Sequence, residues 1–452
     1  RHDMNGNLTE KDFKEFENQF NKNSILGNSR RAVTRNGVFA SSTDNEALKA
    51  AKRSFSVNVD SGSVTNQKRS GRCWMFAGLN VLRGIAIKKL NVKDIEFSQT
   101  YLQFYDKMEK ANSFLDKIIK LVDEPLTSQL SMFVFNTALG DGGYWSYFVN
   151  LVKKYGIVPK DAMPTTAVSD DTGEMNIVLT KLLNKDAMIL RDKFEKGMTK
   201  EGLSKCKKNM LKEVYQILGC SLGLPPKQFV FEYETKAAKD NFERLEADSP
   251  LDFYKKVIGE ELDDYISISN AQLPGFEEGK AYYSPWLDNM QDGQHEFYFE
   301  VSLPTMKKAL IKSLKDNSLV WFASDVLAQS LRKEGVLINN VLNYDSLFDI
   351  DTRMKKGMRL SYYSSYSNHA MTFTGVNLVK GRPNRWKVEN SWGKDNGDSG
   401  FFVMDDDWFD NYVYQVIIKK EYLPSDLVET YQNAIKDPVE TLPFFAIFNS
   451  ID

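Results

Sequence analysis

The sequence predicts an α+β fold, because helical patterns fill its first part and strand patterns its last part. After Cys73, apolar side chains recur at nearly every third or fourth place, which indicates a buried helix. Helical spacing returns over residues 175–194 and 203–218. From about Glu296 onward, β-rich runs bounded by Gly, Pro, Asn or Asp follow one another.

The first 59 residues predict an arm with little core of its own. Arg1–Asp3 precede the first methionine, and we expect them to be a remnant of cloning. Thr9 begins a capping-box pattern, so a helix should extend from there to about Asn21. A weakly structured stretch over 23–44 and a short helix over 46–53 should follow.

The rest of the chain divides by pattern into four segments. Residues 60–164 predict a helical unit with the cysteine motif, and 165–294 predict paired helices that serve assembly and access. Residues 295–422 are rich in strands, and 423–452 predict a final helix, Ser425–Lys436, with an extended apolar tail. The predicted strands are Leu319–Ala323, Met371–Asn377, Arg385–Glu389, Gly400–Val403 and Tyr412–Lys419.

Size, charge and cysteine content limit the class of protein. The 452 residues, 42% of them hydrophobic, can form two or three domain-sized units or one elaborated domain. A formal net charge of −2 makes neither nucleic acid nor an anionic membrane an expected main partner. The only cysteines are Cys73, Cys206 and Cys220, and no signal peptide or membrane-length apolar run is visible. We therefore expect a reducing, cytoplasmic location.

Three short motifs carry a thiol, an imidazole and an amide in the chain order of an activated nucleophile. Cys73 lies in Gln67-Lys-Arg-Ser-Gly-Arg-Cys-Trp-Met-Phe, His369 in Asn-His-Ala, and Asn390 in Asn-Ser-Trp-Gly. A histidine that a third group orients can activate a cysteine thiol. Gln67 is placed to donate to an oxyanion. Each motif alone is more often structural, so the prediction depends on their conjunction.

The local sequence also predicts how this site is supported. Ser70 and Gly71 should supply a turn and a possible cap, which places Cys73 in the first turn of a helix. The helix dipole there favours thiolate, and a protonated His369 would lower the thiol pKa further. Asn390 should hold the imidazole in the productive tautomer. Trp392 should cover that hydrogen bond, and Trp74 is a second supporting residue.

No cofactor is expected. The only histidines are His2, His295 and His369, and neither a His-Glu-x-x-His motif nor another zinc pattern is present. No phosphate loop of the Gly-x-x-x-x-Gly-Lys type and no dinucleotide fingerprint occurs. The chemistry should therefore depend on side chains alone, without a metal.

These motifs resemble those of papain-type cysteine peptidases, with two departures. Ser70 stands where the signature has a first cysteine, and His369 lies far beyond the usual 130–150 residues. Both departures resemble the bleomycin hydrolase and bacterial aminopeptidase C family, as do residues 141–160, 319–322, 369–374 and 388–393. The resemblance extends from about residue 60 to the C-terminus and implies a two-lobe fold, a helical lobe beside a β-barrel-like lobe, with a large helical insertion and an N-terminal hook.

The resemblance further implies peptide substrates, a homohexameric ring and a C-terminal arm that lies in the cleft. Gly142 and Gly143 would lie against the substrate backbone, although by pattern alone they form an ordinary loop before a helix over 144–155. Asp452 would add a carboxylate that meets the substrate ammonium. The implied activity is removal of N-terminal residues through a cysteine thioester. The alternatives are an oligopeptide endopeptidase, an acyl or amide transferase, and a pure binder of protein or nucleic acid.

Overall fold

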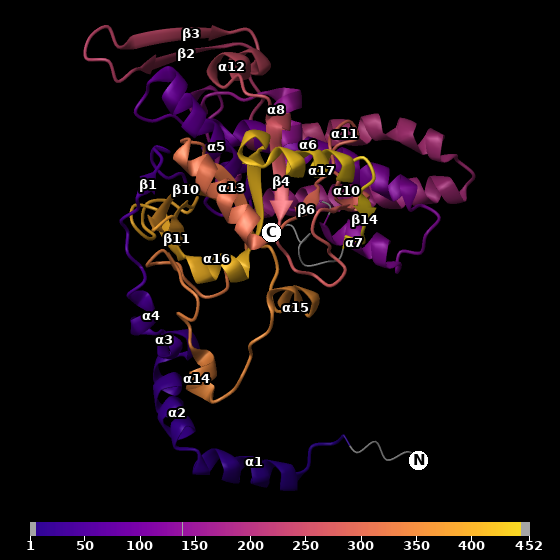
Figure 1. Cartoon of the computed structure of the whole chain (residues 1–452). Coiled ribbons are helices and arrows are strands. Elements are labelled where there is room, and N and C mark those ends of the chain that lie inside the picture. Colours follow the sequence, from indigo (N-terminus) through magenta and orange to yellow (C-terminus); the bar gives the residue numbers. More distant parts are fainter. Residues whose placement is uncertain (1–5, 138, 444–452) are drawn as a thin grey trace.

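One sheet of twelve strands forms the centre of the molecule, and helices cover it (Figure 1). This computed structural model describes residues 6–137 and 139–443. The strand order is β14-β5-β6-β4-β13-β7-β10-β11-β12-β9-β8, with β1 paired to β10. The strands are β1 (Val57–Asn58), β4 (Tyr265–Ser269), β5 (Ala281–Tyr283), β6 (Tyr298–Glu300), β7 (Val320–Ser324), β8 (Ser330–Leu331), β9 (Val336–Leu337), β10 (His369–Val379), β11 (Arg382–Glu389), β12 (Phe401–Asp405), β13 (Val413–Lys419) and β14 (Val439–Glu440).

The five predicted strands are all present, as β7, β10, β11, β12 and β13. The sheet itself is open rather than a barrel, which corrects the barrel-like lobe expected from the sequence. A barrel requires its two edge strands to pair, and no pairing among the described residues joins β14 to β8. The antiparallel neighbours of β10 are β7 and β11, so the strand that begins at His369 lies well inside the sheet.

The helical unit is built around α5 (Cys73–Leu90), which packs against β10. Thirteen of its residues are buried, on all sides of the helix, as expected for a helix inside a core. Its neighbours are α6 (Gln99–Lys120), α7 (Gln129–Thr137) and α8 (Trp145–Tyr155). The predicted helix after the two glycines is therefore confirmed as α8.

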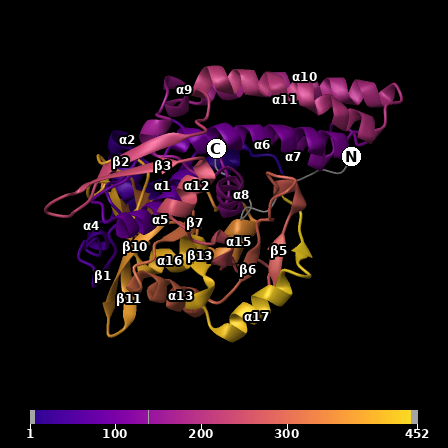
Figure 2. The same ribbon diagram turned by 90° about the horizontal axis from the view of Figure 1, so that it is seen from above.

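The predicted paired helices of the insertion are α10 (Gly173–Glu195) and α11 (Lys200–Leu222), which lie along α6 (Figure 2). The segment 165–294 also contains α9 (Ala167–Asp170), α12 (Pro250–Val257) and a hairpin of β2 (Phe229–Glu234) and β3 (Phe242–Ala247). In addition, β4 and β5 belong to the main sheet. The helices after this segment are α13 (Leu303–Lys315), α14 (Tyr344–Phe348), α15 (Lys356–Ser361), α16 (Asp406–Tyr412) and α17 (Ser425–Ala434).

The arm descends beside the sheet and then turns away from the body (Figure 1). Its first helix, α1 (Glu10–Lys22), has the predicted capping box at Thr9 and buries no residue. The weak structure predicted after it is wrong, because α2 (Ser24–Asn36) and α3 (Val38–Ser42) follow, and then α4 (Asn45–Leu48). The Asn23 side chain caps α2, and Ser29 donates a hydrogen bond to the Leu347 carbonyl in α14. This tertiary contact stabilises a helix that its sequence disfavours.

Candidate active site

The loop that leads into α5 places Cys73 at the first position of the helix. The loop turns sharply at Lys68, which has a left-handed backbone (φ 56°), and its N–H donates to Asn66 Oδ1 at 2.9 Å. The predicted cap at Ser70 or Gly71 is wrong, since Arg72 is the N-cap and no side chain caps the helix. The Ser70 hydroxyl instead accepts from Arg72 Nε at 2.7 Å. The first backbone N–H groups of α5 are thus left free of side-chain caps near the thiol.

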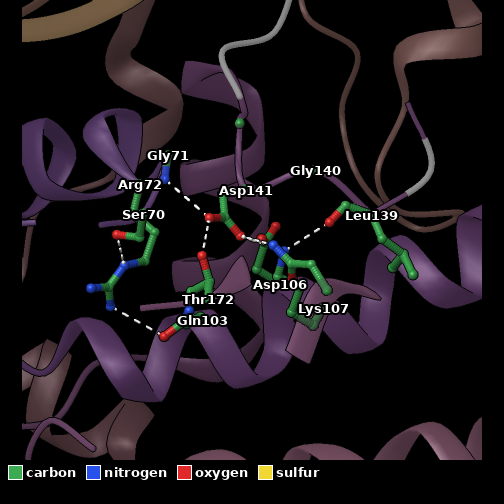
Figure 3. A network of polar contacts seen from close by, with 12 residues as sticks. Ser70, Gly71, Arg72, Gln103, Asp106, Lys107, Leu139, Gly140, Asp141 and Thr172 are labelled. Atoms are coloured by element: carbon green, nitrogen blue, oxygen red, sulfur yellow. Dashed lines mark hydrogen bonds and ion pairs between the residues drawn. The ribbon is translucent and has the colours of Figure 1, made fainter. Parts of the chain in front are cut away.

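A buried carboxylate, Asp141, ties this loop to the rest of the helical side (Figure 3). Its Oδ2 accepts from the Gly71 N–H at 3.0 Å and from Thr172 Oγ1 at 2.5 Å. Its Oδ1 accepts from Lys107 Nζ at 2.7 Å and from Asn176 Nδ2 at 3.0 Å. Burial alone would raise its pKa, but the Lys107 ammonium and these hydrogen bonds hold the pKa of Asp141 well below its usual range.

The strand side supplies the imidazole and the amide. His369 begins β10, and Asn390 directly follows the end of β11. His369 Nε2 lies 2.8 Å from Asn390 Oδ1. The same oxygen accepts from the Ser391 N–H at 2.8 Å, which fixes the orientation of the amide. Because an amide oxygen only accepts, Nε2 carries the proton, and Nδ1 of the neutral ring is left as an acceptor. Trp392 packs on the imidazole with ring centroids 4.7 Å apart.

The two sides meet where β10 packs against α5. The Ala370 N–H, one residue after the histidine, donates to Cys73 Sγ at 3.5 Å. Thr372 Oγ1 donates to the Ala77 carbonyl one turn further along the helix, at 3.2 Å. The structure therefore brings together the predicted thiol, imidazole and amide, although 297 residues separate Cys73 from Ala370 in the sequence.

Gln67 lies beside this pair, and Ser391 holds it there. Ser391 Oγ donates to Gln67 Oε1, and Gln67 Nε2 donates to the Ser70 carbonyl at 2.7 Å. One N–H of the amide is left for another acceptor. Our reading of the sequence missed Ser391, although it lies inside the Asn-Ser-Trp-Gly motif. It also missed Asp141, Lys107 and Thr172, which no short motif connects.

The lowered thiol pKa expected from the helix dipole is wrong for Cys73 when no charged partner is present. Burial raises the pKa of Cys73 to about 12, against the lowering effect of nearby backbone N–H groups. Burial likewise lowers the pKa of His369 to about 4, against the effect of the hydrogen bond that the ring donates to Asn390. Neither charged form is favoured alone in this environment. The neutral thiol and the neutral imidazole are thus the forms that this environment favours.

Gln67 and His369 line a cleft of about 1090 Å³ between the helical and strand sides. Gly142 lies next to this cleft, where it lines a neighbouring cavity of about 370 Å³ that also includes Gly140. A side chain at Gly143 would lie 2.5 Å from the Trp74 ring, so glycine is required there for packing. Trp74 supports this loop, since its Nε1 donates to the Asp141 carbonyl at 2.7 Å. The predicted contribution of Asp452 lies outside the described residues.

Comparisons with known proteins show which family this chain is similar to. A family model described as the Peptidase C1-like family matches residues 7–445. Aminopeptidase C of Lactobacillus delbrueckii subsp. lactis is 38% identical over 431 residues, 95% of each chain. Aminopeptidase E of Lactobacillus helveticus is 40% identical over 432 residues, 95% of this chain and 97% of that protein. A crystal structure of pepw from Lactobacillus rhamnosis superposes with a TM-score of 0.96 at 39% identity, covering 99% of this chain and 100% of that one.

Proposed function

This chain belongs to the Peptidase C1-like family, and we propose that it is a cysteine-type aminopeptidase that releases N-terminal residues from peptides. The resemblance and the papain-like α+β fold class predicted from the sequence are confirmed. The observation that carries the proposed chemistry is the hydrogen bond between His369 Nε2 and Asn390 Oδ1. It leaves Nδ1 of the ring as the base for the Cys73 thiol.

Acylation begins when Nδ1 of His369 takes the thiol proton and the Cys73 sulfur attacks the peptide carbonyl carbon. The oxyanion of the tetrahedral intermediate accepts from the Cys73 backbone N–H and from the free N–H of the Gln67 amide. When the intermediate collapses, the C–N bond breaks and the imidazolium gives its proton to the leaving amine. The acyl group is then held on Cys73 as a thioester.

Deacylation reverses these roles with water as the nucleophile. Neutral His369 takes a proton from water, and the hydroxyl oxygen attacks the thioester carbon. The sulfur leaves as thiolate, takes back the proton from the imidazolium, and the carboxylic acid product departs. Asn390 keeps the ring in one orientation through both steps, while Trp392 excludes water from the hydrogen bond between them.

Matched fluorogenic peptides with free and with acetylated N-termini test this function. We expect hydrolysis of the free peptides only, and none with Cys73→Ala. Equal cleavage of both peptides would favour the endopeptidase alternative. Unchanged cleavage by Cys73→Ala would contradict the thioester mechanism. The C-terminal arm predicted from the sequence lies largely outside the described residues, so this assay also decides whether an N-terminal ammonium is required.

We also propose that the chain self-associates, as a homohexamer, through its arm and insertion. The arm presents exposed aromatic side chains that the body does not cover, at Phe13, Phe16 and Phe39. Exposed apolar patches of this kind mark interaction sites. Light scattering should give six times the chain mass, and Phe13→Ser with Phe16→Ser should lower it. The control pair Lys11→Ser and Glu15→Ser, on the same helix, should not.

The location of the protein and its division into segments are also proposals. No described helix is long and apolar enough to cross a membrane. We propose a cytoplasmic location, which cell fractionation tests. We also propose the division into an arm (1–59), a helical catalytic lobe (60–164), an insertion (165–294), a strand-rich catalytic lobe (295–422) and a C-terminal segment (423–452). Limited proteolysis at these boundaries tests the division.

A further inference from the structure

The catalytic cleft is more positive than the chain as a whole. Six charged side chains line it: Lys68, Arg69, Lys181, Arg332, Asp141 and Asp171. Asp141 forms an ion pair with Lys107 at 2.7 Å, and Asp171 forms one with Arg69 at 3.8 Å. The other three cations make no ion pair with a described residue. Although the chain has a net charge of −2, its cleft therefore carries positive side chains that no described carboxylate neutralises.

Arg332 reaches the catalytic groups through a packing contact. Its guanidinium lies 4.1 Å above the centroid of the Trp392 ring, which also packs on His369 with ring centroids 4.7 Å apart. Burial is the main cause that lowers the pKa of His369, and the charge of Arg332 acts in the same direction. Within residues 6–137 and 139–443, no ion pair or side-chain hydrogen bond engages the guanidinium. Stacking thus holds a planar fork of donors that no side chain of the described residues engages.

The chemistry of the site places Arg332 on the leaving-group side of the cleft. His369 gives its proton to the leaving amine, so that amine must lie against the imidazole. Residues beyond the broken bond then continue towards Trp392 and Arg332, which line the cleft together with His369. An extended peptide advances about 3.4 Å per residue. One or two residues after the scissile bond therefore suffice to reach the guanidinium.

On the basis of the proposed peptidase function, we propose that Arg332 binds the terminal carboxylate of the leaving portion of short peptides. The preferred substrates are then dipeptides and tripeptides with a free C-terminus. A guanidinium matches a carboxylate with two parallel hydrogen bonds. Leu327, which also lines the cleft and is 66% exposed, offers an apolar surface to the side chain of the leaving residue.

The test compares alanyl-leucine with alanyl-leucine amide, which share the N-terminus and the scissile bond. For the full-length protein, kcat/KM for the free acid should exceed that for the amide about 5- to 20-fold. In Arg332→Gln the ratio of the two values should fall to about one. In Arg332→Lys, which keeps the charge but loses the fork, it should be intermediate.

Lys333→Gln is the matched control, because it removes the same charge from the next residue, which does not line the cleft. It should keep the wild-type ratio. A wild-type ratio near one, a ratio unchanged in Arg332→Gln, or an equal fall in Lys333→Gln would overturn the proposal. Hydrolysis of both substrates without discrimination leaves the peptidase function standing. Failure to hydrolyse either would instead contradict that function.

Discussion

Two buried carboxylates lie behind the active site, one on each side, and their surroundings shift their pKa values in opposite directions. On the helical side, Asp141 accepts four hydrogen bonds, one of them from the Lys107 ammonium at 2.7 Å. On the strand side, Glu389 precedes Asn390 and is fully buried, with its nearest cation, Arg83, at 3.8 Å. Burial raises the pKa of Glu389 to about 7, whereas Asp141 is held ionised.

The difference follows from how each side positions its catalytic group. The backbone of Glu389 pairs with Thr372 in the β10–β11 ladder, so the strand places Asn390 without help from the side-chain charge. The loop before Cys73 has no such ladder, and the Gly71 N–H depends on Asp141 instead. We therefore expect the charge of Asp141 to stabilise the loop before Cys73, whereas no charge on Glu389 is needed to position Asn390. Four predictions test this contrast, in order of decreasing effect.

The largest effect is expected where the two sides meet. Cys73→Ala and His369→Ala should each lower kcat/KM by about 10⁴-fold or more, because thiol and imidazole act as one unit. The double variant should be little worse than either single one. Additive losses in the double variant would show that the two groups act independently. Circular dichroism should be unchanged, which separates lost chemistry from lost fold.

Asp141→Ala should destabilise the protein by about 3–5 kcal/mol, because it leaves the buried Lys107 ammonium without a carboxylate. Urea unfolding of the full chain measures this. Asp141→Asn keeps the shape but not the charge and tests which of the two matters. A loss below about 1 kcal/mol in both would contradict the structural function assigned to the charge.

Asn390→Ala should lower kcat by about 10- to 100-fold, because the ring loses its orienting acceptor without losing the base. KM should change little, since no substrate contact is removed. Steady-state kinetics separate the two parameters. An effect confined to KM would mean that Asn390 acts in binding rather than in holding the imidazole.

Glu389→Gln should have the smallest effect, and it should depend on pH. The folded-state pKa of Glu389 is raised from 4.5 to about 7, so its contribution to stability is present below about 4.5 and is lost as pH rises through about 7. The variant should have a higher Tm than the wild type at pH 8 and an equal one at pH 4. Asp141→Asn should show the opposite trend, since the stability from Asp141 is lost as pH falls.

The same contrast explains what the sequence could predict. His369 begins β10 and Asn390 directly follows β11, and both lie in short motifs beside β-rich runs, so local patterns suffice. Asp141 and Lys107 are 34 residues apart and no motif contains both, so their pairing depends on how α6 packs under the loop. The thiol pKa was predicted in the wrong direction because complete burial of Cys73 is a property of the packed core, which the helix dipole does not reveal.

The fold shows the same limits. Strands and helices with strong periodicity were predicted closely, including α5, α10 and α11. The open sheet was not, because β4 and β5 are short strands inside a segment with helical patterns. Of the helices in the arm, α2 and α3 were missed, because Asn and Ser favour caps and turns over helix interiors. The cap at Asn23 and the contact of Ser29 with α14 outweigh this preference.

The central claim is that substrate passes through a thioester on Cys73, and trapping that intermediate tests it most directly. An ester of an amino acid with a free α-amino group is mixed with the full-length protein, quenched in acid and mapped by mass spectrometry. We expect a mass increase of one aminoacyl group on the peptide that contains Cys73. We expect no such increase on the exposed Cys220 or in Cys73→Ala. Turnover of the ester with Cys73 unmodified at every quench time, or acylation of another residue instead, would contradict it.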